Sequence, residues 1–119
     1  MQYKKKSIQK EVTEKQVLSF YGMATRAGKT VSGMDQVSNA VEAGEILMIL
    51  VAKDASMRTR EKIVEISQLH QVPCYLFSNI EELGKFSGKS GRAVCGITDE
   101  GFVKKMHSLL TESQNAQQI

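Results

Sequence analysis

The chain of 119 residues has no tryptophan, a single proline and no long apolar run. Its longest apolar run, from Ile46 to Ala52, is the length of a strand and falls short of the 18 or so residues that a membrane span needs. The first residues, "MQYKKKSIQKEV", are basic but have no apolar stretch after them, which argues against a secretory signal. These absences predict a cytoplasmic protein.

Cysteine and histidine are also scarce, with two of each. Cys74 and Cys95 lie in apolar, strand-like segments without CxxC spacing or a nearby histidine pair, so we expect buried reduced thiols rather than a disulfide or a metal site. His70 and His107 each stand alone on predicted helices. Neither has a partner at the spacing of metal ligands or of a catalytic triad.

No arrangement of residues typical of catalysis is present. The adjacent pair Asp99 and Glu100 points to different faces of a predicted helix, where carboxylates complement the helix dipole better than they share a proton. We therefore expect no enzyme activity, no metal and no cofactor.

Two stretches rich in glycine and lysine resemble phosphate-binding loops: Gly22–Thr30, "GMATRAGKT", and Leu83–Ser90, "LGKFSGKS". A Walker loop needs four residues between its first glycine and the Gly-Lys-Ser/Thr, whereas these stretches have five and three. The second stretch also lies between a predicted helix and a predicted strand, the reverse of the order in a P-loop. Binding of a nucleotide triphosphate is not expected.

Charge is distributed unevenly along the chain, although the formal net charge is only +3. Residues 1–34 have seven Lys and Arg against two acids, residues 35–84 have four against eight, and residues 85–119 have five against three. Basic ends therefore flank an acidic middle. This asymmetry indicates an anionic partner for one face.

Helical spacing of apolar residues alternates with short apolar runs. The predicted helices span about 15–26, 34–43, 57–70, 80–86 and 99–110, and the apolar strands 46–52, 72–77 and 92–98, with a short extended link at 29–32. Ser32 is the predicted cap of the second helix, and a capping box from Ser78 to Glu81 is predicted to start the fourth. Such alternation predicts an α/β protein, a three-layer α/β/α sandwich around a four-stranded sheet. We expect a basic flexible extension at 1–14, one domain at 15–110 and a polar tail at 111–119.

Two loops combine glycines with cations. In Arg26–Gln36 the glycines allow the backbone to approach a ligand closely, cations can meet phosphates, and polar side chains lie on the first turn of a helix. Gly88–Arg92 is a second flexible, basic loop before a strand. Phosphate contacts would position an RNA on these loops, and polar side chains would read its bases.

The order of three motifs, "RAGKTVSG", "ILMILVAKDAS" and "LGKFSGKSGRAVCGITDEGF", resembles the small bacterial YlxQ-type proteins of the ribosomal protein L7Ae kink-turn RNA-binding family. The resemblance covers about residues 15–110. It implies a mixed four-stranded sheet between helices, with RNA held at one edge. It also implies a non-enzymatic protein that recognises a structured RNA, such as ribosomal RNA, with an internal loop of tandem sheared G·A pairs. We expect a monomer.

The resemblance carries over to particular residues. Gly33 matches the family glycine that lets the backbone approach RNA. Asp35 and Gln36 stand where Asn and Glu are common, and Asn39 stands where Lys is usual, so the common cation is missing at that position. The predicted RNA-binding residues are Arg26, Lys29, Ser32, Gly33, Met34, Asp35, Gln36, Asn39, Lys89, Ser90 and Arg92.

An alternative is a protein-interaction module of the translation apparatus that has lost kink-turn recognition. The acidic middle of the chain, which includes Glu42, Glu45, Glu81 and Glu82, would then meet a basic partner.

Overall fold

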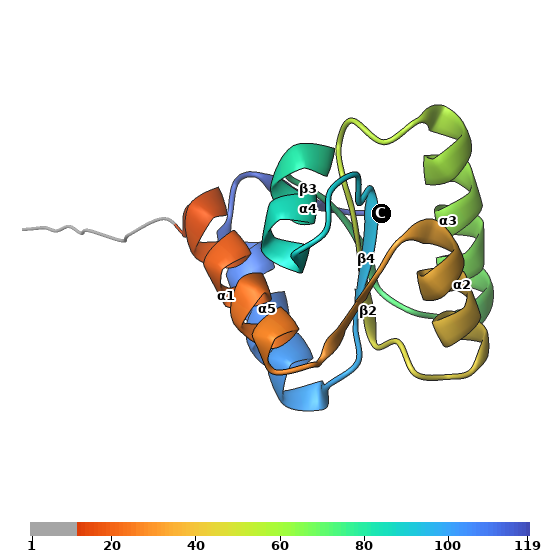
Figure 1. Ribbon diagram of the computed structural model, residues 1–119, viewed down its shortest axis with the longest axis horizontal. Helices are drawn as coiled ribbons and strands as arrows, with labels where there is room; N and C mark the ends of the chain where they lie inside the picture. The colour runs from red at the N-terminus through yellow and green to blue at the C-terminus, as the bar shows by residue number, and fades with distance from the viewer. Residues whose placement is uncertain (1–11) are drawn as a thin grey trace, which may run out of the picture.

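A computed structural model describes residues 12–119, so residues 1–11, most of the predicted basic extension, lie outside the described residues. Five helices cover the two faces of a sheet in three layers (Figure 1). The helices are α1 (Glu14–Arg26), α2 (Met34–Glu42), α3 (Met57–His70), α4 (Ile80–Ser87) and α5 (Glu100–Glu112). One layer holds α1, α4 and α5, and the other holds α2 and α3 (Figure 1). The predicted α/β sandwich is confirmed.

The sheet is mixed, with the order β1-β4-β2-β3-β5. Its strands are β1 (Thr30–Ser32), β2 (Met48–Val51), β3 (Cys74–Phe77), β4 (Val94–Ile97) and β5 (Ala116–Gln118). Only β2 and β3 are parallel, and every other pair is antiparallel. Because β1 pairs with β4, part of the first predicted loop, Arg26–Gln36, lies beside the strand that follows the second predicted loop, Gly88–Arg92.

Alternating side chains of the central strands build a separate core on each face of the sheet. Met48 and Leu50 of β2 join the apolar cluster under α1, α4 and α5, whereas Ile49 and Val51 join the cluster under α2 and α3. All four side chains are fully buried. A strand buried on both faces has a continuous apolar sequence, as this one does.

The predicted count of four strands is wrong, because the sheet has five. Ala116–Gln118, inside the predicted polar tail, forms β5 at the edge of the sheet beside β3. Its two glutamines are exposed, so the apolar alternation that marks a half-buried strand is missing. Backbone pairing holds this end of the chain in place: the Ile119 N–H donates to the Cys74 carbonyl at 2.9 Å.

Two predicted caps are displaced by one residue. Asn79, not Ser78, caps α4 by accepting a hydrogen bond from the Glu82 N–H, and Ser78 instead has a φ of 61° and donates to Glu14 Oε2 at 3.1 Å. At α2 the N-cap is Gly33, which has no side chain to accept a bond. At α4 the neighbouring Asn79 takes the cap because Ser78 makes a tertiary contact, whereas at α2 the strand β1 extends through Ser32.

Both cysteines are free and buried, as predicted. Among residues 12–119, no helix has the length and apolar character required to span a membrane.

Candidate functional site

Gly33 occupies the N-cap of α2 in a backbone conformation that favours glycine, with φ 102° and ψ 144°. Its N–H donates to the Val94 carbonyl at 2.9 Å, and its own carbonyl accepts from the Val37 N–H at 2.9 Å. The turn between β1 and α2 is thus held to the sheet on one side and to the helix on the other.

The side chains of Gln36 and Arg92 occupy the space that a Cβ on Gly33 would need. Arg92 Nη1 lies 2.7 Å from that position, and the Gln36 side-chain amide is also in contact with it. The absence of a side chain at Gly33 therefore lets one residue of each predicted loop meet over the start of α2. The Nε of Arg92 is buried and has no hydrogen-bond partner among residues 12–119.

The loop after α4 folds back onto its own helix. Lys89 N–H donates to the Gly84 carbonyl at 2.9 Å, and a Cβ on Gly84 would lie only 2.6 Å from the Lys89 carbonyl oxygen. Gly88 and Gly91 have φ values of 74° and 72°, which make this tight return possible. Lys89 and Ser90 remain exposed. The loop is therefore a fixed turn that presents a cation.

A groove of about 290 Å³ lies between the two predicted loops. Its lining residues come from α1, β1, α2, α4 and the loop after α4: Thr25, Thr30, Val31, Ser32, Gln36, Ser87 and Lys89. We call this the β1 groove. It brings together Ser32, Gln36 and Lys89, three of the residues that the sequence singled out.

Buried polar groups support the wall of the β1 groove. The Tyr21 hydroxyl and Ser87 Oγ are 2.6 Å apart, and Ser87 Oγ is 3.5 Å from Cys95 Sγ. Burial raises the pKa of Tyr21 and of Cys95 above their ordinary values, so both groups stay neutral at physiological pH. Thr30 Oγ1 donates to Thr25 Oγ1 at 3.0 Å on the same wall.

The hydroxyl residues Thr25, Thr30 and Ser87 of this groove were not among the predicted RNA-binding residues. Serine and threonine are common near helix ends and in short strands for local reasons, so only the positions of Thr30 and Ser87 beside the Gly-Lys loops could have been a signal.

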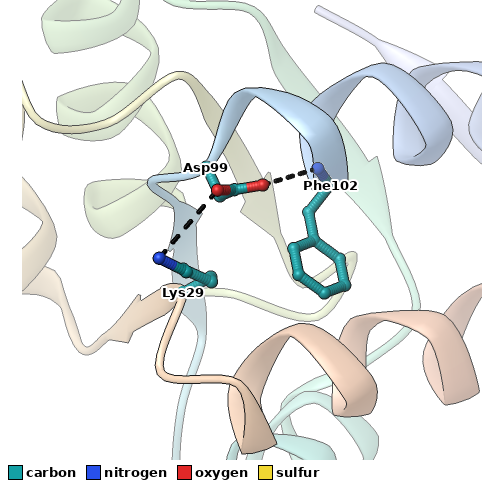
Figure 2. A network of polar contacts seen from close by, with 3 residues as sticks. All are labelled: Lys29, Asp99 and Phe102. Carbon is teal, nitrogen blue, oxygen red and sulfur yellow. Dashed lines mark hydrogen bonds and ion pairs between the residues drawn. The ribbon is translucent and has the colours of Figure 1, made fainter.

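Lys29 lies at the opposite end of β1 from Gly33. Its Nζ is 4.0 Å from Asp99 Oδ1, and Asp99 also accepts a hydrogen bond from the Phe102 N–H at 3.0 Å (Figure 2). Asp99 is therefore the cap of α5, as the dipole argument predicted, and it partly neutralises Lys29. Arg26 is exposed in the last turn of α1.

The remaining predicted residues of α2 have different surroundings. Met34 is half-buried and packs on the core under α2 and α3, which accounts for its apolar side chain. Asp35 directly precedes Gln36, and Asn39 follows Gln36 by about one turn; both are exposed. Residues 12–119 contain no group of three or more His, Cys, Asp or Glu side chains able to hold a metal ion.

Residues 15–107 match the sequence profile of the Ribosomal protein L7Ae/L30e/S12e/Gadd45 family. The chain belongs to this family. The matched range includes β1, the start of α2 and the loop after α4, and it ends before β5. The resemblance seen in the three sequence motifs is therefore confirmed.

Relatives within the L7Ae family have names that refer to RNA. The chain is 36% identical over 89 residues to the RNA-binding protein YlxQ of Bacillus subtilis, covering 75% of this chain and 89% of that protein. It is 32% identical over 100 residues to the RNA-binding protein YlxQ of Enterococcus faecium, covering 84% of this chain and 96% of that protein.

Solved structures share the L7Ae fold of this chain. A protein of unknown function from Bacillus halodurans matches with a TM-score of 0.77 and 33% identity, over 82% of this chain and 98% of that one. A 15.5 kD RNA-binding protein from Giardia lamblia matches with a TM-score of 0.66 over 78% of this chain and 80% of that one. At 15% identity, the second likeness concerns the fold alone.

Proposed function

We propose that this chain is a non-enzymatic RNA-binding protein of the cytoplasm that holds a structured, kink-turn-like RNA element over the β1 groove. The names of its YlxQ relatives support RNA as the partner. The observation that carries the proposal is the meeting of Gln36 and Arg92 over Gly33, beside the exposed Lys89. The amide of Gln36 and the cations of Arg92 and Lys89 thus lie together at the start of α2, where the missing side chain of Gly33 leaves room for Gln36 and Arg92.

Each of these residues has a role suited to its chemistry. The Gln36 amide offers both a donor and an acceptor to a base edge exposed in a non-helical loop. Lys89 and Arg92 contact phosphates and fix the register of the RNA. Ser32, on the wall of the groove, offers a hydroxyl to the sugar or the base.

Departures from the family pattern alter how charge is arranged at this site. Asn39 supplies no cation on α2, whereas Arg92, from the loop after α4, places one beside Gly33. Asp35 adds a negative charge on the first turn of α2. We propose that the protein binds as a monomer to a ribosomal or similarly structured RNA, with Arg92 replacing the charge that the family has on this helix.

The decisive experiment is a binding titration with a kink-turn RNA and a plain RNA duplex of equal length and charge, at physiological and at doubled salt. We expect tighter binding to the kinked RNA at both salt concentrations. Equal affinity for both RNAs with a steep salt dependence would reduce the site to a phosphate contact. No binding to either RNA would contradict the proposal and favour a protein partner.

A further inference from the structure

A second groove runs along α1 where α5 lies beside it, the two helices running in opposite directions (Figure 1). Its volume is about 460 Å³. The groove is lined by Thr13, Lys15, Gln16, Ser19, Phe20, Met23 and Leu109. None of these residues lines the β1 groove. We call this the α1/α5 groove.

Three of the seven residues that line the α1/α5 groove are apolar: Phe20, Met23 and Leu109. Phe20 packs against Phe102 of α5 with ring centroids 5.3 Å apart, and Leu109 follows two turns later on α5. Met23 is 49% exposed, whereas the apolar residues of α1 that face the core are buried. An aromatic pair flanked by an exposed methionine is a surface that a partner can bury, since methionine and aromatic side chains are enriched at interfaces.

Each of the two helices beside this groove has an exposed lysine. Lys15 lines the groove, and Lys105 is exposed on α5, one turn before Leu109. The carboxylate of Glu14 is turned away to accept from Ser78 Oγ, while Glu100 and Glu112 stand at the two ends of α5. Lys15 is therefore the only charged residue among the described residues that line the groove.

We propose that the α1/α5 groove is the docking site for an acidic amphipathic helix of a partner protein. A helix laid between two others packs its apolar ridge into their groove, with anchors at positions i, i+3 or i+4, and i+7. Phe20, Met23 and Leu109 receive those anchors, and Asp or Glu on the flanks meets Lys15 and Lys105. From Lys15 to Met23 the groove extends about 12 Å along α1, which two to three turns of a docked helix cover.

The two grooves share no lining residue, so a helix docked in the α1/α5 groove does not need to displace RNA from the β1 groove. This inference does not depend on the proposed RNA site and can be tested without RNA.

The test uses the full chain and a fluorescent synthetic peptide of about four helical turns, with Glu on its polar face and Leu and Phe at the anchor spacing. We expect saturable binding of this peptide and at least tenfold weaker binding of a scrambled peptide of the same composition. Met23→Glu and Met23→Ala should each weaken binding, the first by at least tenfold. Met57→Glu is the matched control, because Met57 is 70% exposed on α3 in the other helical layer.

Charge complementarity between the groove and the peptide is tested by reversing the charge on each. Lys105→Glu should weaken binding of the Glu peptide and strengthen binding of a version with Lys in place of Glu. Equal binding of the designed and scrambled peptides, or no effect of Met23→Glu, would overturn the proposal. Two other results would also overturn it. A dimer of the wild-type chain that Met23→Glu dissociates would assign the groove to a second copy. A loss of RNA affinity in Met23→Glu but not in Met57→Glu would assign the groove to RNA.

Discussion

Arg92 Nη1 lies 2.7 Å from the position that a Cβ on Gly33 would occupy. The two residues come from segments far apart in the sequence, which the antiparallel pairing of β1 and β4 brings together. Any side chain at Gly33 must displace Arg92, Gln36 or both. The arrangement of Gln36 and Arg92 at the proposed RNA site therefore requires glycine at position 33.

Substitution of Gly33→Ala should impair both folding and RNA binding. Its φ of 102° strains any other residue, at a cost of about 1–3 kcal/mol in the free energy of unfolding, and the new Cβ displaces Gln36 and Arg92. We expect at least tenfold weaker binding to the kink-turn RNA. Gly44→Ala is the matched control, because it has a φ of 75° and open space around it. Urea unfolding and RNA titration of both variants separate strain from displacement, and an equal loss of RNA affinity in both would contradict the role of Gly33.

Removal of the cations at the second loop should change how RNA binding depends on salt. In the double variant Lys89→Ala, Arg92→Ala, we expect the slope of log affinity against log salt to fall by about 2, as two phosphate contacts are lost. The control is Arg58→Ala, Lys62→Ala, which removes the same charge from exposed positions on α3. An unchanged slope in the first pair would remove the loop after α4 from the RNA site.

Much of the fold was predictable because helices and buried strands have local patterns. The five helices and the three apolar strands follow from spacing alone, and Ser56 caps α3 by accepting a hydrogen bond from the Thr59 N–H. β5 was missed because an exposed edge strand needs only backbone partners, and the residues Ala116–Gln118 contain no pattern that requires pairing.

The two segments of the candidate site were predictable from the sequence, but their meeting on one surface was not. Glycines next to cations marked both loops, yet the position of Gln36 and Arg92 over Gly33 depends on the pairing of Ser32 with Cys95 across β1 and β4. Pairing between distant strands leaves no signal within either segment. For the same reason the sequence placed Lys29 with the other cations, whereas the structure pairs it with Asp99 at the far end of β1.

Substitution of Asp99→Asn should release Lys29 while keeping the helix cap. Asn is also a good N-cap, so the bond from the Phe102 N–H is retained, and loss of a partly exposed ion pair costs less than about 1 kcal/mol of unfolding free energy. If Lys29 contacts phosphate, RNA affinity at low salt should rise about threefold. The same substitution in a Lys29→Ala background is the control, and an equal gain there would show that Asp99 repels RNA without involving Lys29.

Cys74 should make the fold less stable at high pH. Burial raises the pKa of its thiol from 9.0 to about 11, partly opposed by a hydrogen bond with Ser67. The unfolded chain therefore loses the thiol proton first, and stability falls as pH rises from about 9 to about 11. Between pH 8 and pH 10 this group should cost about 1 kcal/mol of unfolding free energy, measured by urea unfolding under reducing conditions.

Cys74→Ala should reduce that pH dependence by the same amount. Tyr21, Tyr75 and Cys95, whose pKa values burial also raises, should keep part of it. An identical pH dependence in Cys74→Ala and in the wild-type chain would show that the Cys74 thiol ionises equally in both states.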